Sequence, residues 1–131
     1  MADTRNNPRP LSPHLQIWRW TLPFAMSGSH RITGAALTFG LPLLIWLLVA
    51  AAIGPDQFEI AQAVFSSWFG LLILFGFSWA LTQHLLGGLR HLMWDTGRGL
   101  DLPSIFRSAW AVVIGTIGLV VLLWIIGFLV A

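Results

Sequence analysis

Three long stretches without a charged side chain constrain this chain of 131 residues more than any other feature. No Asp, Glu, Lys or Arg occurs in residues 32–55, 60–89 or 108–131. Each stretch exceeds the roughly 20 residues with which an α-helix crosses a hydrocarbon core of about 30 Å. We therefore predict an all-α integral membrane protein that forms one membrane-anchor domain over residues 1–131. The transmembrane helices are expected near residues 30–53, 63–93 and 108–130.

The composition excludes several other classes of protein. Only 9% of the residues are charged and 56% are hydrophobic, whereas a soluble domain carries about 25% charged residues. The basic residues are seven arginines without a basic run, so we expect no binding of nucleic acid. The absence of cysteine excludes disulfides, thiolate metal sites and a cysteine nucleophile.

The arginines predict the orientation of the chain in a bacterial inner membrane. They fall into two groups, before the first stretch and in the second loop: Arg5, Arg9, Arg19 and Arg31, then Arg90, Arg98 and Arg107. The first loop carries only Asp56 and Glu59. By the positive-inside rule, the N-terminus and the second loop are cytoplasmic and the C-terminus is periplasmic. Residues 15–20 are expected to lie along the membrane surface before the first helix.

His84 is the most informative polar residue of the second stretch. It precedes Arg90 by six residues, which places it roughly 9 Å deeper than the membrane interface. An ionisable residue at this depth faces protein, water or a cofactor. Gly87 and Gly88 on its face each cost about 1 kcal/mol of helix propensity against alanine, so a flat macrocycle or a close helix neighbour is expected to need the space. Ligation of haem iron and an interhelical hydrogen bond remain alternatives for His84.

His91 shares this face but stands about 10.5 Å from His84 along the helix axis. It is therefore not the opposite axial ligand of the same iron. We expect His91 to be a residue of the membrane interface that lies near a haem propionate if it serves the cofactor at all.

The start of the first membrane helix carries Ser27, Ser29, His30 and Arg31. Ser27, Arg31 and Thr38 recur at helical spacing, so one helix face is polar. In one interpretation Ser27 caps the helix and Arg31 extends to lipid phosphate. In the other, both side chains approach a buried polar group, such as a cofactor carboxylate or the carbonyl of a headgroup.

Two segments resemble the signatures of a known family, the cytochrome b subunit of succinate dehydrogenase. The first is RPLSPHLQI at residues 9–17 together with SGSHRITG at residues 27–34. The second is HLLGGLRHLMWD at residues 84–95, which fits the pattern H-x-x-x-G-x-R-H-x-x-x-D. The resemblance extends over the whole chain in length and number of spans. Gly28 and Ser29 depart from it, because relatives often have an apolar pair there.

The resemblance implies a membrane anchor of respiratory complex II that packs against a second anchor subunit of three helices. That complex also contains a flavoprotein subunit that oxidises succinate and an iron–sulfur subunit that relays electrons. The implied ligands are haem b and ubiquinone. By position, His84 matches the axial haem ligand, and Ser27 and Arg31 match the quinone-site residues. His30, Arg31 and His91 are then expected on the side of the haem propionates, and the second axial ligand comes from the other anchor chain.

Two alternatives belong to other functional classes. A haemless structural anchor or assembly factor would keep the three spans but show no pigment. A small transporter or channel subunit would need polar residues along a continuous path across the membrane, whereas here they concentrate at one end of two helices.

Overall fold

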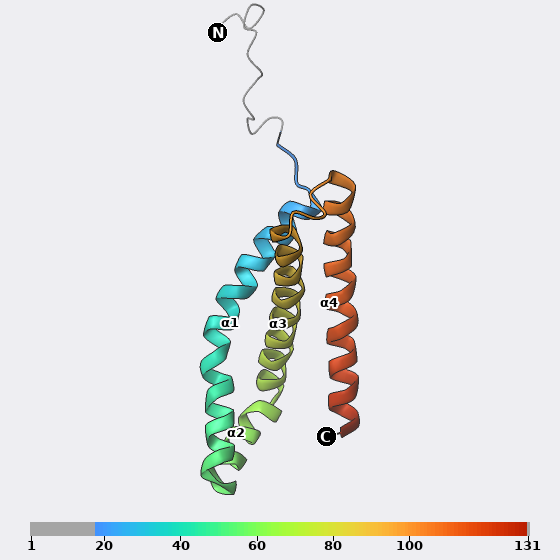
Figure 1. Cartoon of the computed structure of the whole chain (residues 1–131). Coiled ribbons are helices and arrows are strands. Elements are labelled where there is room, and N and C mark those ends of the chain that lie inside the picture. The colour runs from blue at the N-terminus through green and yellow to red at the C-terminus, as the bar shows by residue number, and fades with distance from the viewer. Residues whose placement is uncertain (1–17, 131) are drawn as a thin grey trace, which may run out of the picture.

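The computed structural model describes residues 18–130, and all regular structure in this range is helical. Figure 1 shows the helices in chain order: α1 (Leu22–Ile53), α2 (Pro55–Ser66), α3 (Trp68–Asp95) and α4 (Leu102–Val130). The expected all-α membrane fold is therefore confirmed. The signature at residues 9–17 and most of the expected surface segment at residues 15–20 lie outside the described residues.

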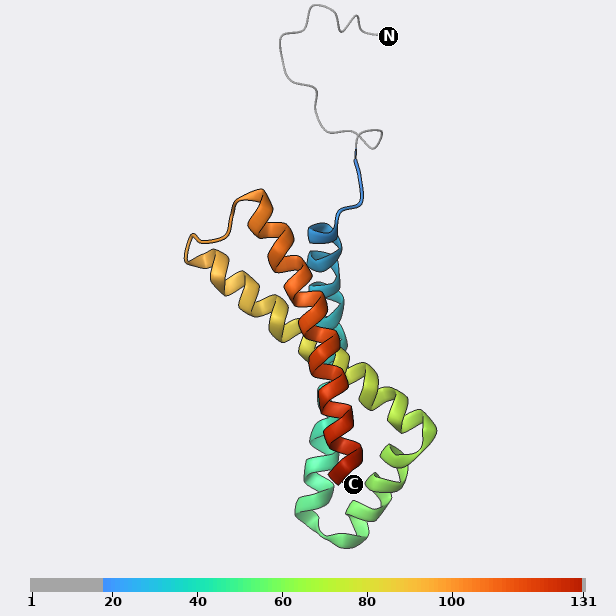
Figure 2. The ribbon, with the colours of Figure 1, turned by 90° about the vertical axis from the view of Figure 1, so that its right-hand side faces the viewer.

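Within residues 18–130, the helices α1, α3 and α4 are long and apolar enough to span a membrane. They contain 32, 28 and 29 residues and are strongly apolar, and at about 1.5 Å per residue each exceeds the hydrocarbon thickness. The start of α1, the end of α3 and the start of α4 lie at one end of the molecule, opposite α2 (Figure 1). In Figure 2, α3 crosses α1 and α4 at a steep tilt.

The first helix begins eight residues earlier than predicted, at Leu22 rather than residue 30. Pro23 lies in its first turn, where the missing proline N–H has no partner to lose. The prediction was wrong because it began the helix where charge ends. A helix that extends into the interface keeps serine and arginine side chains in polar surroundings.

The second predicted helix, residues 63–93, is interrupted at Ser67. The Ser67 hydroxyl donates to the carbonyl of Val64 at 2.6 Å and accepts from the N–H of Gly70 at 3.1 Å. One side chain thus ends α2 and caps α3. Hydropathy could not reveal this break, because the residues on both sides of it are apolar.

The first loop is a helix rather than an irregular connection, since Asp56 and Glu59 both lie on α2. Gly54 ends α1 with a φ of 145°, a backbone conformation that favours glycine. Pro55 then starts α2. Glycine and proline together thus mark the boundary between α1 and α2.

The second loop is shorter than predicted, because α4 begins at Leu102 rather than residue 108. Arg90 lies on α3 and Arg107 on α4, so only Arg98 of the three arginines is in the turn. Asp101 accepts the N–H of Ser104 at 3.0 Å, and hydrogen bonds from Ser104 lower the pKa of the Asp101 carboxyl group. This contact caps the first turn of α4.

The interior of the bundle is small or polar, whereas the exterior is large and apolar. The buried polar side chains are Thr33, Thr82, Gln83, Arg90 and Thr116. The buried apolar ones are mostly alanine and valine, while many Leu, Ile, Phe and Trp side chains are exposed. This distribution is typical of helices that pack in lipid, where small residues allow close approach and polar residues bond across helices.

Gln83 connects all three membrane helices. Its side chain is 4% exposed, and its amide nitrogen donates to the Ser29 hydroxyl of α1 at 2.8 Å. Its amide oxygen accepts the Thr116 hydroxyl of α4 at 2.9 Å. Because water is absent at this depth, both ends of the amide need protein partners.

Replacing Gln83 with leucine should destabilise the bundle. Each interhelical hydrogen bond in a membrane contributes about 0.6–1.7 kcal/mol, so Gln83→Leu should cost about 1–3 kcal/mol. Thermal unfolding of the solubilised protein, with associated subunits retained, measures the loss. Gln62→Leu makes the same chemical change at an exposed position of α2 and should have little effect. Equal stability of the two variants would contradict the role assigned to Gln83.

Candidate functional site

Three histidines gather where α1 packs against α3. The rings of His30 and His84 are stacked, with centroids 4.0 Å apart and planes inclined by 16°. His91 meets the His30 ring edge-on at a centroid distance of 4.8 Å. The His30 ring of α1 therefore lies between His84 and His91, which are two turns apart on α3.

Glycines permit this close approach of the two helices. A Cβ atom on Gly34 would lie 2.9 Å from Cε1 of His84, and one on Gly87 would overlap the His30 ring. Within this chain, the space expected beside His84 is thus occupied by a close helix neighbour. On the Gly87 face that neighbour is the His30 ring itself.

Hydrogen bonding determines which nitrogen of a neutral His84 ring carries the hydrogen. Its Nδ1 lies 3.0 Å from the backbone carbonyl oxygen of His30, and a carbonyl can only accept. Nδ1 therefore carries the hydrogen, and Nε2 keeps its lone pair in the neutral ring. A histidine held in this way can ligate a metal through Nε2, as metal-bound histidines usually do when the other nitrogen is hydrogen-bonded.

The His30 ring carries a polar atom without a partner in the described chain. Its Nε2 is buried and makes no hydrogen bond within residues 18–130. A buried polar group of this kind costs free energy unless it is paired. A hydrogen-bonding group supplied from outside the chain would satisfy it, and a carboxylate would do so in the tautomer that carries the hydrogen on Nε2.

These observations fit a haem better than a bare metal ion. Among residues 18–130, no group of three or more His, Asp or Glu side chains is placed to hold an ion between them. A porphyrin needs only an axial nitrogen from the protein, and its carboxylates match the unpaired His30 Nε2. The residues present therefore fit the haem that the sequence led us to expect.

Ser27 and Arg31 lie about one turn apart within α1, which also carries His30. The interpretation in which Ser27 caps the helix is wrong, because the N-cap residue is Thr21. Ser27 is half-buried, while Arg31 and Thr38 on the same helix face are exposed. Ser29, by contrast, bonds to Gln83 of α3. Arg31 and Thr38 of this face therefore lie on the outside of the described bundle, open to lipid, a cofactor or another subunit.

Arg90, which the sequence places near the membrane interface, is a buried link between α3 and α4. The side chain is 6% exposed. Its Nε donates to the Ser108 hydroxyl at 2.9 Å, and its Nη2 donates to the Ile105 carbonyl at 3.2 Å. The guanidinium carbon lies 4.1 Å from the centre of the Trp94 ring. Arg90 therefore holds α4 beside the C-terminal half of α3, which carries His84 and His91.

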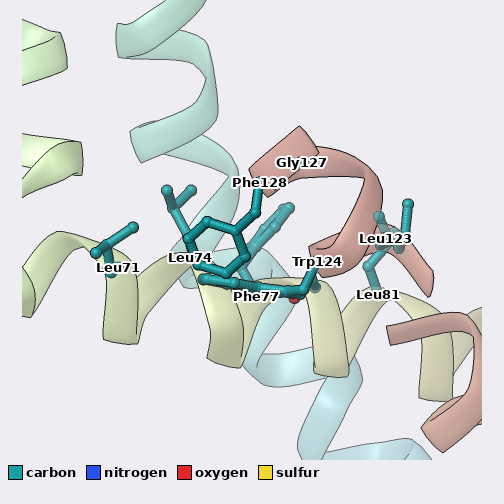
Figure 3. A pocket seen from close by; sticks show the side chains of 9 residues that line it. Leu71, Leu74, Phe77, Leu81, Leu123, Trp124, Gly127 and Phe128 are labelled. Carbon is teal, nitrogen blue, oxygen red and sulfur yellow. The ribbon is translucent and has the colours of Figure 1, made fainter. Parts of the chain in front are cut away.

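A separate apolar pocket of about 440 Å³ lies between α3 and α4, toward the C-terminal end of α4 (Figure 3). It is lined by Leu71, Leu74, Phe77, Ser78, Leu81, Leu123, Trp124, Gly127 and Phe128. The Trp124 indole N–H donates to the Ser78 hydroxyl at 3.0 Å, so the polar atoms of these two residues are already paired. The pocket lies along the N-terminal half of α3, ends at Leu81 about one turn before His84, and offers apolar surface rather than reactive groups.

Comparison with known proteins assigns the chain to a family. Residues 5–123 match the family described as succinate dehydrogenase/fumarate reductase transmembrane subunit. The chain is 47% identical over 128 residues to the succinate dehydrogenase cytochrome b556 subunit of Paracoccus denitrificans, with 98% of each chain covered. The corresponding subunit of Rickettsia typhi is 35% identical over 119 residues, covering 91% of this chain and 93% of the relative.

A mitochondrial relative is similar over much of the same range. The succinate dehydrogenase cytochrome b560 subunit of Sus scrofa is 41% identical over 114 residues, which cover 83% of this chain and 66% of that protein. With its three apolar helices and its match to the family over most of its length, this chain belongs to the succinate dehydrogenase/fumarate reductase transmembrane subunits.

Proposed function

We propose that the chain is the haem b- and quinone-binding anchor of a succinate:quinone oxidoreductase, respiratory complex II, and passes electrons from succinate oxidation to ubiquinone. The cytochrome b names of its relatives support the haem. The observation that carries the proposal is the hydrogen bond from His84 Nδ1 to the His30 carbonyl. It leaves Nε2 of a membrane-embedded histidine available as an axial ligand.

The partners in this proposal are a second anchor subunit, an iron–sulfur subunit and a flavoprotein subunit. His84 would hold the haem iron from this chain, and the resemblance to the family implies that a histidine of the other anchor would provide the second ligand. Ligation by two histidines fills both axial positions of the iron and suits a one-electron carrier rather than oxygen binding. The exposed Leu, Ile and Phe side chains of the spans face the bilayer and this second anchor.

Three basic side chains of this chain serve the haem carboxylates. His30 Nε2 is buried and unpaired within the described chain, and its N–H would donate to a propionate oxygen. Arg31 follows directly on α1, and the His91 ring contacts the His30 ring. Their positive or hydrogen-bonding groups lower the cost of holding carboxylates near the membrane interface.

Removing the proposed ligand tests the haem assignment. His84→Leu should abolish the haem b signal, or shift it, in the reduced-minus-oxidised optical spectrum and the electron-resonance spectrum of the purified complex. His91→Leu should retain a low-spin haem, because His91 is not a ligand. A signal unchanged by His84→Leu in an assembled complex would contradict the assignment. Absence of haem from the unaltered complex would favour the haemless anchor.

Ser27 and Arg31 form part of the quinone site in this proposal. Residues four apart on a helix share a face, so both can approach one headgroup. The Ser27 hydroxyl donates a hydrogen bond to a quinone carbonyl. The positive charge of Arg31 stabilises the negative charge that develops on the headgroup as it is reduced.

Variants at these two positions separate quinone chemistry from assembly. Ser27→Ala or Arg31→Leu should lower quinone reduction by roughly tenfold or more, since one charge-assisted contact is worth about 1.5–3 kcal/mol. Succinate oxidation with an artificial dye acceptor should persist. Ser66→Ala on α2 and Arg107→Leu on α4, both at exposed positions, are the matched controls. Equal loss of both activities would instead indicate a structural role.

The arginines support an orientation with the N-terminus and the α3–α4 turn in the cytoplasm of a bacterial cell and the C-terminus in the periplasm. Arg19, Arg31, Arg98 and Arg107 lie near the end of the bundle that holds the start of α1 and the α3–α4 turn, opposite the acidic residues of α2. Positive residues favour the cytoplasmic side. Electrons from cytoplasmic redox subunits would then arrive at the end that carries the histidines.

Single cysteines test this orientation cleanly, because the chain has none of its own. Thr96→Cys, in the α3–α4 turn, should resist an impermeant thiol reagent added to intact cells. Gln57→Cys, exposed on α2, should react. Strong external labelling at position 96 with protection at position 57 would reverse the assigned topology.

A further inference from the structure

The Thr33 side chain of α1 lies against the ring nitrogen of His84 that faces away from the proposed iron position. Its Oγ1 is 3.4 Å from Nδ1 of His84, beside the His30 carbonyl oxygen at 3.0 Å from the same nitrogen. Nδ1 thus has two oxygen neighbours, both from α1. The contact crosses between helices, and Thr33 is 7% exposed, so water does not replace it.

The direction of these hydrogen bonds follows from the Thr33 hydroxyl. It donates its single hydrogen to the Ser29 carbonyl at 2.8 Å or the His30 carbonyl at 3.0 Å. Its oxygen then keeps lone pairs directed at His84, and only Nδ1 can supply a hydrogen between them. Thr33 therefore acts as an acceptor and favours the same tautomer of His84 as the His30 carbonyl does.

Neighbouring contacts hold Thr33 in this place. Gln83 of α3 donates to the hydroxyl of Ser29, the residue whose carbonyl accepts from Thr33. Gly34 allows the His84 ring to approach α1, because a side chain there would lie 2.9 Å from its Cε1. Contacts between α1 and α3 thus hold the Thr33 oxygen and the His84 ring next to each other.

We propose that Thr33 is a positioning residue for the haem ligand, which accepts a hydrogen bond from His84 Nδ1 and so tunes the ligand's electron donation through Nε2. This inference rests on the proposed function of His84. A hydrogen bond at the outer nitrogen makes imidazole a stronger donor. Stronger donation stabilises ferric over ferrous iron and lowers the midpoint potential of the haem.

The test uses the complete complex with its haem and compares three variants by redox titration and low-temperature electron resonance. Thr33→Val keeps the shape but removes the acceptor oxygen, so the midpoint potential should rise. A change of up to tenfold in the ferric-to-ferrous ratio corresponds to about 59 mV for one electron. The electron-resonance g-values of the ferric haem should change with it. Thr33→Ser retains the oxygen and should keep both properties close to those of the unaltered complex.

Thr82→Val is the matched control. Thr82 is 5% exposed and its hydroxyl donates to the Ser78 carbonyl four residues earlier at 2.8 Å, as Thr33 does to Ser29. Its loss removes the same backbone contact without removing a neighbour of His84 Nδ1. The haem potential should therefore stay unchanged in this variant.

Several results would overturn the inference that Thr33 tunes the haem ligand. The inference is overturned if Thr33→Val leaves the haem potential unchanged, shifts it no more than Thr82→Val does, or is matched by Thr33→Ser. Thr33→Ala provides a second variant without the oxygen. If neither Val nor Ala at this position assembles while Ser does, the hydroxyl is structural and the inference also fails. Absence of haem from the unaltered complex, or a normal haem signal in His84→Leu, would instead overturn the proposed function.

Discussion

The lack of water in the hydrocarbon core is the constraint on which this structure depends. A polar group in a membrane helix must find its partner within protein, and the bundle meets this requirement by packing polar side chains inward. Gln83 pairs with Ser29 and Thr116, and Arg90 pairs with Ser108 and the Ile105 carbonyl. The same requirement directs Nδ1 of His84 to the backbone of α1. The groups that could serve a cofactor are held by the contacts that hold the helices together.

Hydropathy predicted the number of membrane helices correctly, because a span needs a minimum length of apolar sequence. It misplaced their ends because charge marks the edge of the hydrocarbon core, whereas a helix ends where its backbone loses hydrogen bonds. Helix α1 therefore continues outward to Leu22, past Arg31. The break at Ser67 depends on one hydroxyl, and serine is common enough in membrane helices to carry no such signal by itself.

The candidate site was predictable residue by residue but not as an arrangement. Depth in the membrane made His84 a candidate, and helical position together with the resemblance made His30, His91, Ser27 and Arg31 candidates. The stacking of His30 on His84 requires the register of α1 against α3, which neither argument contains. Two contributors, Thr33 and Gln83, were missed for the same reason. A glutamine in the middle of an apolar helix was nonetheless a signal, since such a residue needs a partner in lipid.

The unpaired Nε2 of His30 connects the fold of the single chain to its assembly. Every other buried side-chain nitrogen or oxygen among residues 18–130 has a hydrogen-bond partner within the chain. The His30 nitrogen is therefore the one such atom in this range whose burial costs free energy without a compensating hydrogen bond. In the proposed complex, a haem carboxylate would pair with it, and His84 would hold the haem iron from this chain. A group that binds the assembled form better than the separate chains stabilises the assembly by mass action. Cofactor binding and subunit association would then be thermodynamically linked, and the unpaired His30 nitrogen is the contribution that this subunit makes to that linkage.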